Sequence, residues 1–276
     1  MQKLKIGMSA LQSTEIDAAE EVFRSILAVN PSEIHSLHFL GIVLCQKGDL
    51  SSGVELIEKS IGIDPSRFGP FLNMGRFLVD AHQYEHAIPV LQQAVSMDIS
   101  SIDAWDLLAR ASFQAEDFDT AVEAGRNALH LMPDNAEYAF NLGLYLSAVN
   151  EAGNAIDSYQ LAVSLNPVYL EGWVNLGDLL REVGQQEDSI AAYHSALDIN
   201  QACFQACMGL SRVQADKGCW EESLTISQKA FAIDPNSHDA AFWIGFSLHK
   251  LGQSIEAIDA YQKALLLPPE SARTYL

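Results

Sequence analysis

Small residues recur along this chain at an interval of 34 residues, and this period restricts the fold more than any other feature of the sequence. The series begins at Gly7, and each of its eight members is glycine, alanine or serine. The members are Gly7, Gly41, Gly75, Ala109, Gly143, Gly177, Ser211 and Gly245. A fixed period of this length indicates an array of similar structural units, each packed on its neighbours.

A second series marks the end of each unit. Proline fills six of the eight positions that lie 24 residues after the small residues, and proline keeps the residue before it out of helical geometry. These positions are Pro31, Pro65, Ile99, Pro133, Pro167, Gln201, Pro235 and Pro269. Apolar residues between the two series recur at intervals of three and four, as in Trp173, Leu176 and Leu180. Each unit is therefore predicted to hold two helices of roughly 12–15 residues joined by a short turn.

The small residue lies inside the first helix of each unit, where glycine costs about 1 kcal/mol relative to alanine. We infer that it faces another small residue 12 positions later, as Gly41 would face Gly53, so that the two helix axes approach closely. Four further glycines fall in the predicted turns, where a positive φ favours glycine. They are Gly48, Gly184, Gly218 and Gly252.

Unit 170–203 resembles the tetratricopeptide repeat (TPR). Its matching residues are Trp173, Leu176, Gly177, Tyr193 and Ala196, while Ser189 and Gln201 replace the usual alanine and proline. The resemblance covers residues 1–271 as eight repeats: 1–33, 34–67, 68–101, 102–135, 136–169, 170–203, 204–237 and 238–271. It implies an all-α, right-handed superhelical solenoid in which the first helix of each repeat lines a concave groove.

Two places in the array depart from the repeat pattern. In repeat 204–237, polar residues such as Ser211 and Ser227 occupy positions that are usually apolar or small, which predicts a softer joint. Residues 272–276 are expected to start a further helix or a cap. A solenoid normally ends in a polar capping helix, and none is evident here. The chain is therefore expected to be a segment of a longer protein, with a short natural cap as the alternative.

The style of the repeats is similar to that of TPR arms in bacterial glycosyltransferase, sulfotransferase and methyltransferase proteins, and in O-linked N-acetylglucosamine transferase. This resemblance implies a bacterial protein and raises the alternative that the chain is the substrate-recognition arm of a larger transferase. No P-loop, GxGxxG, GxSxG or HExxH motif is present. We therefore expect no catalysis within the chain itself, while a downstream catalytic domain stays an alternative.

Metal and cofactor sites are not expected. Two histidine pairs have helical spacing, His35/His38 and His82/His86, but two histidines without a third ligand rarely bind a metal. Cys203, Cys207 and Cys219 are interpreted as buried structural cysteines.

The chain is strongly acidic, with 36 acidic residues against 16 basic ones and a formal net charge of −20. Nucleic acids need neutralisation by lysine and arginine, and anionic membrane surfaces repel an acidic protein, so neither is an expected partner. A net negative charge of this size can serve to keep the protein soluble or to attract a basic partner. A role in solubility is the favoured interpretation. No CxxC pair, signal peptide or apolar run of the ~18 residues needed to span a bilayer occurs, so a cytoplasmic location is expected.

The resemblance to the TPR family places positions 2, 5, 6, 9, 12 and 13 of each repeat in the groove, counted from the first residue of the repeat. Position 6 carries Asn73, Asn141 and Asn175, and position 9 carries Arg76 and Asp178. A side-chain amide both donates and accepts, so it can pair with an extended peptide backbone. These five residues are candidates for peptide binding, in an incomplete version of the asparagine ladder that the transferase resemblance implies. The alternative is that the asparagines simply contact water.

The last full repeat adds three aromatic candidates, Phe242, Trp243 and Phe246. Exposed aromatic residues usually mark an interface, although a ninth repeat or a downstream domain covering them is an equal alternative. Acidic residues at position 2 would repel a carboxylate terminus, which disfavours the C-terminal tails of chaperones as ligands. These residues are Asp103, Glu137, Glu171 and Asp239.

Three functions follow from these features. The favoured prediction is a protein-interaction scaffold whose groove binds a protein or peptide client. The alternatives are the transferase arm and a homo-oligomeric scaffold that self-associates through its end repeats.

Overall fold

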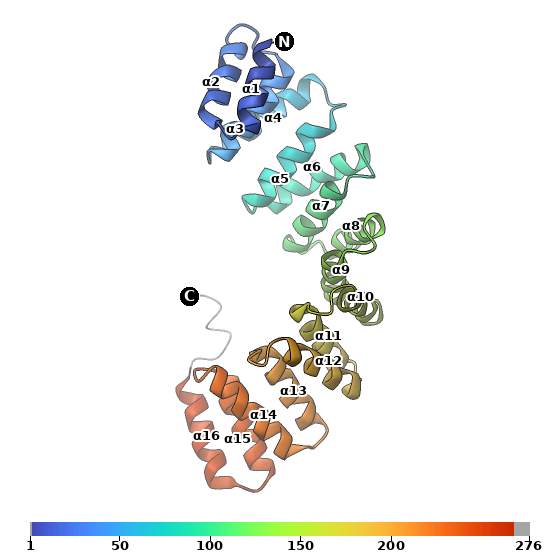
Figure 1. The fold of residues 1–276 in the computed structure, drawn as a ribbon, viewed down its shortest axis with the longest axis vertical. Helices are drawn as coiled ribbons and strands as arrows, with labels where there is room; N and C mark the ends of the chain where they lie inside the picture. Colours follow the sequence, from blue (N-terminus) through green and yellow to red (C-terminus); the bar gives the residue numbers. More distant parts are fainter. Residues whose placement is uncertain (1, 268–276) are drawn as a thin grey trace. The chain divides into compact units, whose positions relative to one another are not determined.

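The computed structural model of the chain describes residues 2–267, which form α-helices joined by short turns and contain no strand (Figure 1). The helices are α1 (Gln2–Gln12), α2 (Ile16–Leu27), α3 (Ile34–Gln46), α4 (Leu50–Ile63), α5 (Phe68–Asp80), α6 (Tyr84–Met97), α7 (Ile102–Gln114), α8 (Phe118–Leu131), α9 (Ala136–Ala148), α10 (Ala152–Leu165), α11 (Leu170–Glu182), α12 (Gln186–Ile199), α13 (Phe204–Asp216), α14 (Trp220–Ile233), α15 (His238–Lys250) and α16 (Ser254–Leu266). The predicted all-α repeat fold is confirmed.

The helices occur in pairs, because each odd-numbered helix packs along the even-numbered helix that follows it. From α3 onward, the odd-numbered helices begin at residues 34, 68, 102, 136, 170, 204 and 238, which are the first residues of the predicted repeats. Within the part of the chain that the structure describes, no helix is long and apolar enough to cross a membrane. Residues 272–276, predicted to start a further helix or a cap, lie outside the described residues.

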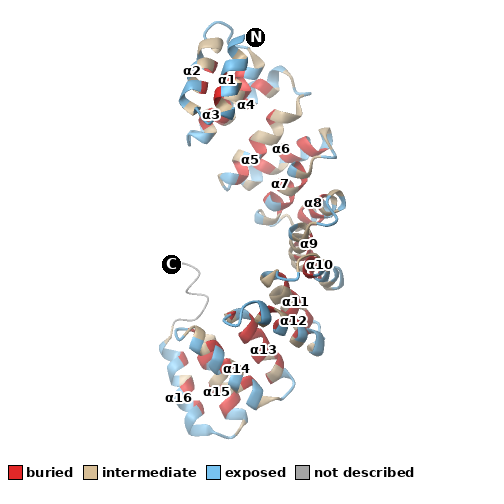
Figure 2. Ribbon diagram, in the orientation of Figure 1, coloured by how far each residue is buried: buried red, intermediate tan, exposed pale blue. Residues whose placement is uncertain are grey.

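The chain divides between Pro133 and Asp134 into two compact units, which contain α1–α8 and α9–α16. Within each unit, the even-numbered helix of one repeat also packs against the odd-numbered helix of the next, as α2 does on α3 and α10 does on α11. Figure 2 shows buried residues within nearly every pair of helices and exposed residues around the turns. The single continuous solenoid over residues 1–271 stays a prediction.

Close packing explains the small residues inside the odd-numbered helices. A Cβ atom on Gly41 would lie 2.7 Å from the carbonyl oxygen of Gly53. The Oγ of Ser189 donates a hydrogen bond to the carbonyl oxygen of Gly177 at 2.7 Å. The predicted contact between small residues 12 positions apart is therefore confirmed for these two pairs. The structure adds a second obstacle that does not follow from the period of 34, since a Cβ on Gly177 would also lie 2.7 Å from the ring of Tyr193.

The turn within each pair of helices uses the same backbone conformation in every repeat. One residue in each turn has a positive φ, and these residues follow one another at intervals of 34: Thr14, Gly48, His82, Glu116, Asn150, Gly184, Gly218 and Gly252. The four glycines predicted for the turns have this conformation. The other four turns place a residue with a side chain there, at φ values between 58° and 60°.

Polar residues in repeat 204–237 form a buried hydroxyl network instead of the usual apolar contacts. The Oγ of Ser211 lies 2.6 Å from the Oγ of Ser227 and 3.1 Å from that of Ser223. The Oγ of Ser223 lies 3.0 Å from the Oγ of Ser247 in the next repeat. All four side chains are fully buried. Each hydroxyl nevertheless has a hydrogen-bond partner, because the four serines bond one another. That this repeat is a softer joint stays a prediction.

Candidate functional site

The predicted binding residues all lie on odd-numbered helices. Asn73 and Arg76 lie on α5 in the first unit. The remaining six lie in the second unit: Asn141 on α9, Asn175 and Asp178 on α11, and Phe242, Trp243 and Phe246 on α15. Two of the eight candidates therefore belong to the first unit and six to the second.

The amide of Asn73 is used inside the first unit. Its Nδ2 lies 3.1 Å from the Nε2 of His38 on α3. Burial lowers the pKa of His38 to about 4, with further contributions from the nearby Arg67 and His35. The ring is therefore neutral at physiological pH, and its Nε2 can accept a hydrogen bond from the amide. His38, one member of the histidine pair His35/His38, is therefore the partner of the candidate residue Asn73.

Arg76 forms an ion pair between neighbouring repeats. Its Nη2 lies 2.8 Å from the Oδ2 of Asp103 at position 2 of the next repeat. The second unit contains an equivalent pair, in which Arg212 Nη2 lies 3.0 Å from Asp239 Oδ2. Both pairs join residues 27 positions apart, and we call them the arginine–aspartate bridges. Arg76, Asp103 and Asp239 stood out in the sequence, but their pairing did not, although the constant spacing of 27 could have indicated it.

Asn141 and Asn175 occupy equivalent positions in adjacent repeats but have different partners. The Nδ2 of Asn175 donates to the carbonyl oxygen of Glu171, one turn earlier in the same helix, at 2.8 Å. The half-buried amide of Asn141 makes no hydrogen bond with any described residue. Among the three candidate asparagines, only Asn141 has a side-chain amide without a hydrogen-bond partner in the described residues.

Asp178 is held by a buried tyrosine. The hydroxyl of Tyr193 donates to the Oδ1 of Asp178 at 2.6 Å. Burial, the Asp178 charge and this hydrogen bond raise the pKa of Tyr193 well above its usual value. Gly209, at position 6 of the following repeat, leaves room for the tyrosine ring, because a Cβ there would overlap its atoms. Gly209 therefore has a packing role, because it makes room for the ring of Tyr193.

The three aromatic candidates form a cluster on α15. The rings of Phe242 and Phe246 are stacked with centroids 6.2 Å apart, and Trp243 lies 5.4 Å from Phe246. Two further rings complete the cluster, since Trp220 lies 5.8 Å from Phe246 and Tyr261 lies 5.7 Å from Phe242. Phe242 is 41% exposed.

A lysine covers part of this aromatic cluster. The Nζ of Lys250 lies 5.3 Å from the centroid of the Phe246 ring and 5.6 Å from that of Trp220. This distance is in the range of a cation–π interaction. The cluster therefore already holds one cation, and Phe242 is its most exposed ring.

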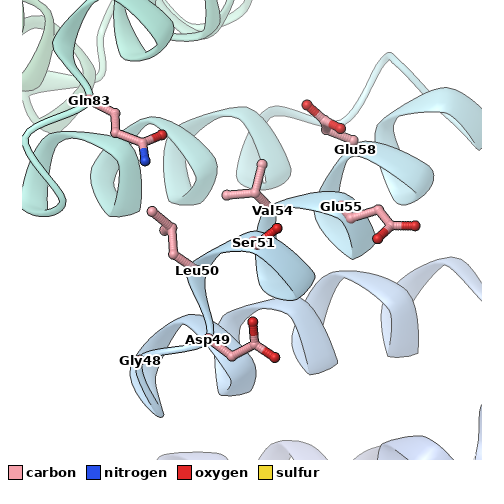
Figure 3. Close-up of a pocket in the computed structure, with 8 residues that line it drawn as sticks. All are labelled: Gly48, Asp49, Leu50, Ser51, Val54, Glu55, Glu58 and Gln83. Atoms are coloured by element: carbon pink, nitrogen blue, oxygen red, sulfur yellow. The ribbon is translucent and has the colours of Figure 1, made fainter.

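An open hollow in the first unit carries none of the predicted binding residues (Figure 3). Its lining includes Asp49, Glu55 and Glu58 from α4 and the preceding turn, and Gln83 from the turn before α6. Asp49 accepts a hydrogen bond from the backbone N–H of Ser52 as the N-cap of α4. Glu55 pairs with Lys59 at 2.7 Å. Asp49 and Glu55 therefore already have partners within the protein, and no ligand is needed to explain these two carboxylates.

The cysteines and histidines do not assemble into a metal site in the part of the chain that the structure describes. No group of three or more histidine, cysteine, aspartate or glutamate residues there could hold a metal ion. All four cysteines are free thiols, and burial raises the pKa of Cys45 to about 11. A thiol with so high a pKa is a poor nucleophile at neutral pH.

Comparison with protein-family models connects this arrangement to known proteins. Models described as tetratricopeptide repeat match residues 72–136 and 107–169, and also residues 170–203 and 238–271. Together these matches cover more than half of the chain. No curated protein matches the sequence significantly.

Solved structures with a similar fold are also TPR proteins. The C-terminal part of a TPR repeat-containing protein from Cytophaga hutchinsonii is 13% identical, with a TM-score of 0.73, covering 87% of this chain and 99% of that chain. YrrB is 21% identical, with a TM-score of 0.60 and coverage of 68% and 96%. MamA is 24% identical, with a TM-score of 0.57 and coverage of 59% and 90%. At these identities the similarity establishes the fold alone.

Proposed function

Because this chain belongs to the tetratricopeptide-repeat superfamily, we propose that it is a non-catalytic scaffold whose odd-numbered helices hold an extended segment of a client protein. Repeats of this kind present the same helix from every unit along one continuous surface. YrrB, which has a similar fold, is described as a TPR protein with an unusual peptide-binding site. Peptide binding by this chain is part of the proposal.

The observation that carries the proposal is the unpaired amide of Asn141. It lies on α9 at the same repeat position as Asn175 on α11. The side-chain Nδ2 of Asn175 donates a hydrogen bond within its own helix. The side-chain Oδ1 of Asn175 is left as an acceptor. An extended peptide alternates N–H and C=O groups along its backbone, so amides at a repeating interval can bind it regardless of its sequence.

The test is to select binders for the full chain from a library of random linear peptides, and to measure the affinity of those binders for the Asn141→Ala/Asn175→Ala variant. Each lost hydrogen bond is worth about 1 kcal/mol, so the two substitutions should weaken binding by about ten-fold or more. The thermal melting temperature should change by no more than about two degrees, because neither side chain packs in the core.

Asn154→Ala provides a matched control. This exposed asparagine lies on the even-numbered helix α10 of the same unit, and its Nδ2 bonds Glu151 at 2.7 Å. Peptide affinity should be unchanged in this variant. If the double variant binds the selected peptides as tightly as the original protein does, the odd-numbered helices are not the binding surface.

The end of the second unit favours a second candidate function, self-association. Ile255, Ile258 and Leu265 on α16 are 76%, 55% and 80% exposed, an unusual concentration of exposed apolar residues on one helix. A second copy of the protein would bury this helix face. In a longer chain, a further repeat or an attached domain such as a transferase would bury it instead.

Light scattering over a concentration series tests self-association, and the variant Ile255→Glu/Ile258→Glu should abolish any dimer. A monomer at all concentrations excludes this function.

A further inference from the structure

One helix face of the second unit combines aromatic rings, side-chain amides and acidic groups. It is formed by α9, α11 and the residue before α11, and we call it the α9–α11 face. Its residues are Glu137, Phe140, Asn141, Tyr169, Glu171 and Asn175. The ring of Tyr169 lies 4.9 Å from that of Phe140, so the turn before α11 packs directly on α9. Glu137 precedes Phe140 by three residues and therefore lies on the same side of α9.

Two glutamates of this face, Glu137 and Glu171, act electrostatically on the hydroxyl of Tyr169. Burial raises the pKa of Tyr169, and the charges of Glu137 and Glu171 raise it further. Both carboxylates belong to exposed residues, and neither forms an ion pair with any described residue of the second unit. The face therefore presents two unneutralised negative charges beside one aromatic ring.

The acidic residue at position 2 is neutralised by an arginine in two other repeats. Glu137 and Glu171 occupy position 2 of their repeats, as do Asp103 and Asp239. The two aspartates are paired with an arginine 27 residues earlier, in the arginine–aspartate bridges. The equivalent residue for Glu171 is Leu144, which cannot supply a charge. Arg110, the equivalent residue for Glu137, is paired with Asp106 in its own helix at 3.6 Å.

The sequence around the face offers no other cation. No lysine or arginine occurs between Arg126 and Arg181, a stretch that includes the whole of α9 and α10 and most of α11. Arg181 itself lies near the end of α11, and its Nη1 lies 3.8 Å from Asp216. The charge of the α9–α11 face is therefore left to be complemented from outside the chain.

We propose that the α9–α11 face binds an extended basic segment of a client protein, with one arginine or lysine side chain lying between Glu137 and Glu171 against the ring of Tyr169. The cation takes the place that an arginine of the preceding repeat occupies in the arginine–aspartate bridges. An aromatic ring and paired carboxylates both favour a guanidinium or ammonium group. The amides of Asn141 and Asn175 hold the adjacent peptide backbone. This inference rests on the proposed function and adds the charge of the client to it.

The first experiment uses three fluorescein-labelled linear peptides and the full chain. One peptide has arginine at every third position among glycine and serine, the second has citrulline in place of arginine, and the third has glutamate. Citrulline keeps the shape of arginine and removes its charge. Fluorescence anisotropy should show binding of the arginine peptide, at least ten-fold weaker binding of the citrulline peptide and no binding of the glutamate peptide. Equal affinity for the arginine and citrulline peptides overturns the inference.

The second experiment separates this face from the general acidity of the protein. The variant Glu137→Gln/Glu171→Gln should bind the arginine peptide about ten-fold more weakly. The control variant Asp157→Asn/Glu256→Gln removes the same charge from exposed positions on the even-numbered helices α10 and α16, and should bind almost normally. Equal weakening in both variants shows that the peptide responds only to net charge, which overturns the inference.

The role of the tyrosine is tested by two substitutions. Tyr169→Phe keeps the ring and should retain binding of the arginine peptide, while Tyr169→Leu removes the ring and should weaken binding several-fold. If both variants bind like the original protein, the ring does not contact the cation and that part of the inference is wrong.

The library selection described above distinguishes the two proposals. If its binders are neutral or acidic and still depend on Asn141 and Asn175, the proposed function holds and the basic client is excluded. If its binders are basic and depend on the asparagines and the glutamates together, both proposals are supported. Binders that depend on neither set contradict both.

Discussion

At the scale of single residues, the same side chain in the same repeat position has three different environments. Asn73 bonds a histidine of the preceding repeat, Asn175 bonds its own helix, and Asn141 has no partner among the described residues. A buried or paired amide must break a hydrogen bond before it can bind a peptide, whereas a free amide exchanges only water. The repeat position therefore defines where an asparagine points, and its neighbours define whether it is available.

His38 should make the stability of the protein depend on pH. Its folded pKa is lowered from 6.5 to about 4, so between these values the unfolded chain binds a proton that the folded protein does not. The stabilisation is fully present above pH 6.5 and is lost as the pH falls toward 4, by up to about 3 kcal/mol. His38→Gln should therefore flatten the decrease in melting temperature between about pH 7 and about pH 5.

The control for this measurement is His86→Gln, which changes an exposed histidine in the same unit. Its melting temperature should follow that of the original protein across the pH range. If His38→Gln shows the same slope as the original protein, His38 is not the group that binds the proton.

The helix glycines should differ sharply in their tolerance of alanine. A Cβ on Gly143 would lie 2.6 Å from the ring of Tyr159, whereas a Cβ on Gly153 would have no atom within 4 Å. Gly143→Ala should destabilise the protein by about 1–3 kcal/mol through overpacking. Gly153→Ala should leave its stability unchanged or raise it by up to about 1 kcal/mol. Chemical denaturation measures both, and equal effects would show that the ring can move aside.

At the scale of helices and turns, the described residues repeat one turn eight times, with five different residue types at its positive-φ position. Four turns use glycine at the residue with positive φ, and four use threonine, histidine, glutamate or asparagine. A left-handed conformation costs roughly 1–2 kcal/mol for most residues with a side chain and less for asparagine. Packing of the two helices on each side therefore maintains a turn that the local sequence disfavours.

Glycine at these four positions should stabilise the protein. Glu116→Gly should raise the free energy of unfolding by about 1 kcal/mol, because Glu116 has a φ of 60°. Asn150→Gly should have a smaller effect, since asparagine tolerates this conformation. Urea denaturation tests both substitutions, and a loss of stability in Glu116→Gly would mean that the carboxylate makes a contact worth more than the backbone strain. Gly184→Ala is the reverse control and should destabilise.

At the scale of the whole molecule, the excess of negative charge should oppose folding. With a formal net charge of −20, self-repulsion is strong at low ionic strength and is screened as salt is added. Raising sodium chloride from about 0.05 M to about 0.5 M should therefore raise the melting temperature by about a few degrees. The same change should weaken binding of the arginine peptide. A melting temperature that falls with salt would show that the ion pairs between repeats outweigh the repulsion.

The sequence predicted the backbone better than it predicted the contacts of the candidate site. The starts of the odd-numbered helices and the four glycine turns were predictable, because proline, glycine and apolar spacing act locally. The availability of Asn73, Arg76 and Asp178 was not, because His38, Asp103 and Tyr193 lie between 15 and 35 residues away and meet them only after the helices pack. Pairs of this kind become predictable once the period is known, as the two bridges with a spacing of 27 show.

The sequence by itself determined the all-α repeat fold, its period and the residues at the close contacts between helices. Each of these follows from a residue's own steric properties, such as a missing Cβ or a ring that fixes φ. Tertiary structure alone decided which polar side chains are used internally and which are left for a partner. For Asn73, Asp103 and Asp239 that choice depends on distances between side chains of different repeats. Asn141, Glu137 and Glu171 have no such partner among the described residues of their own unit.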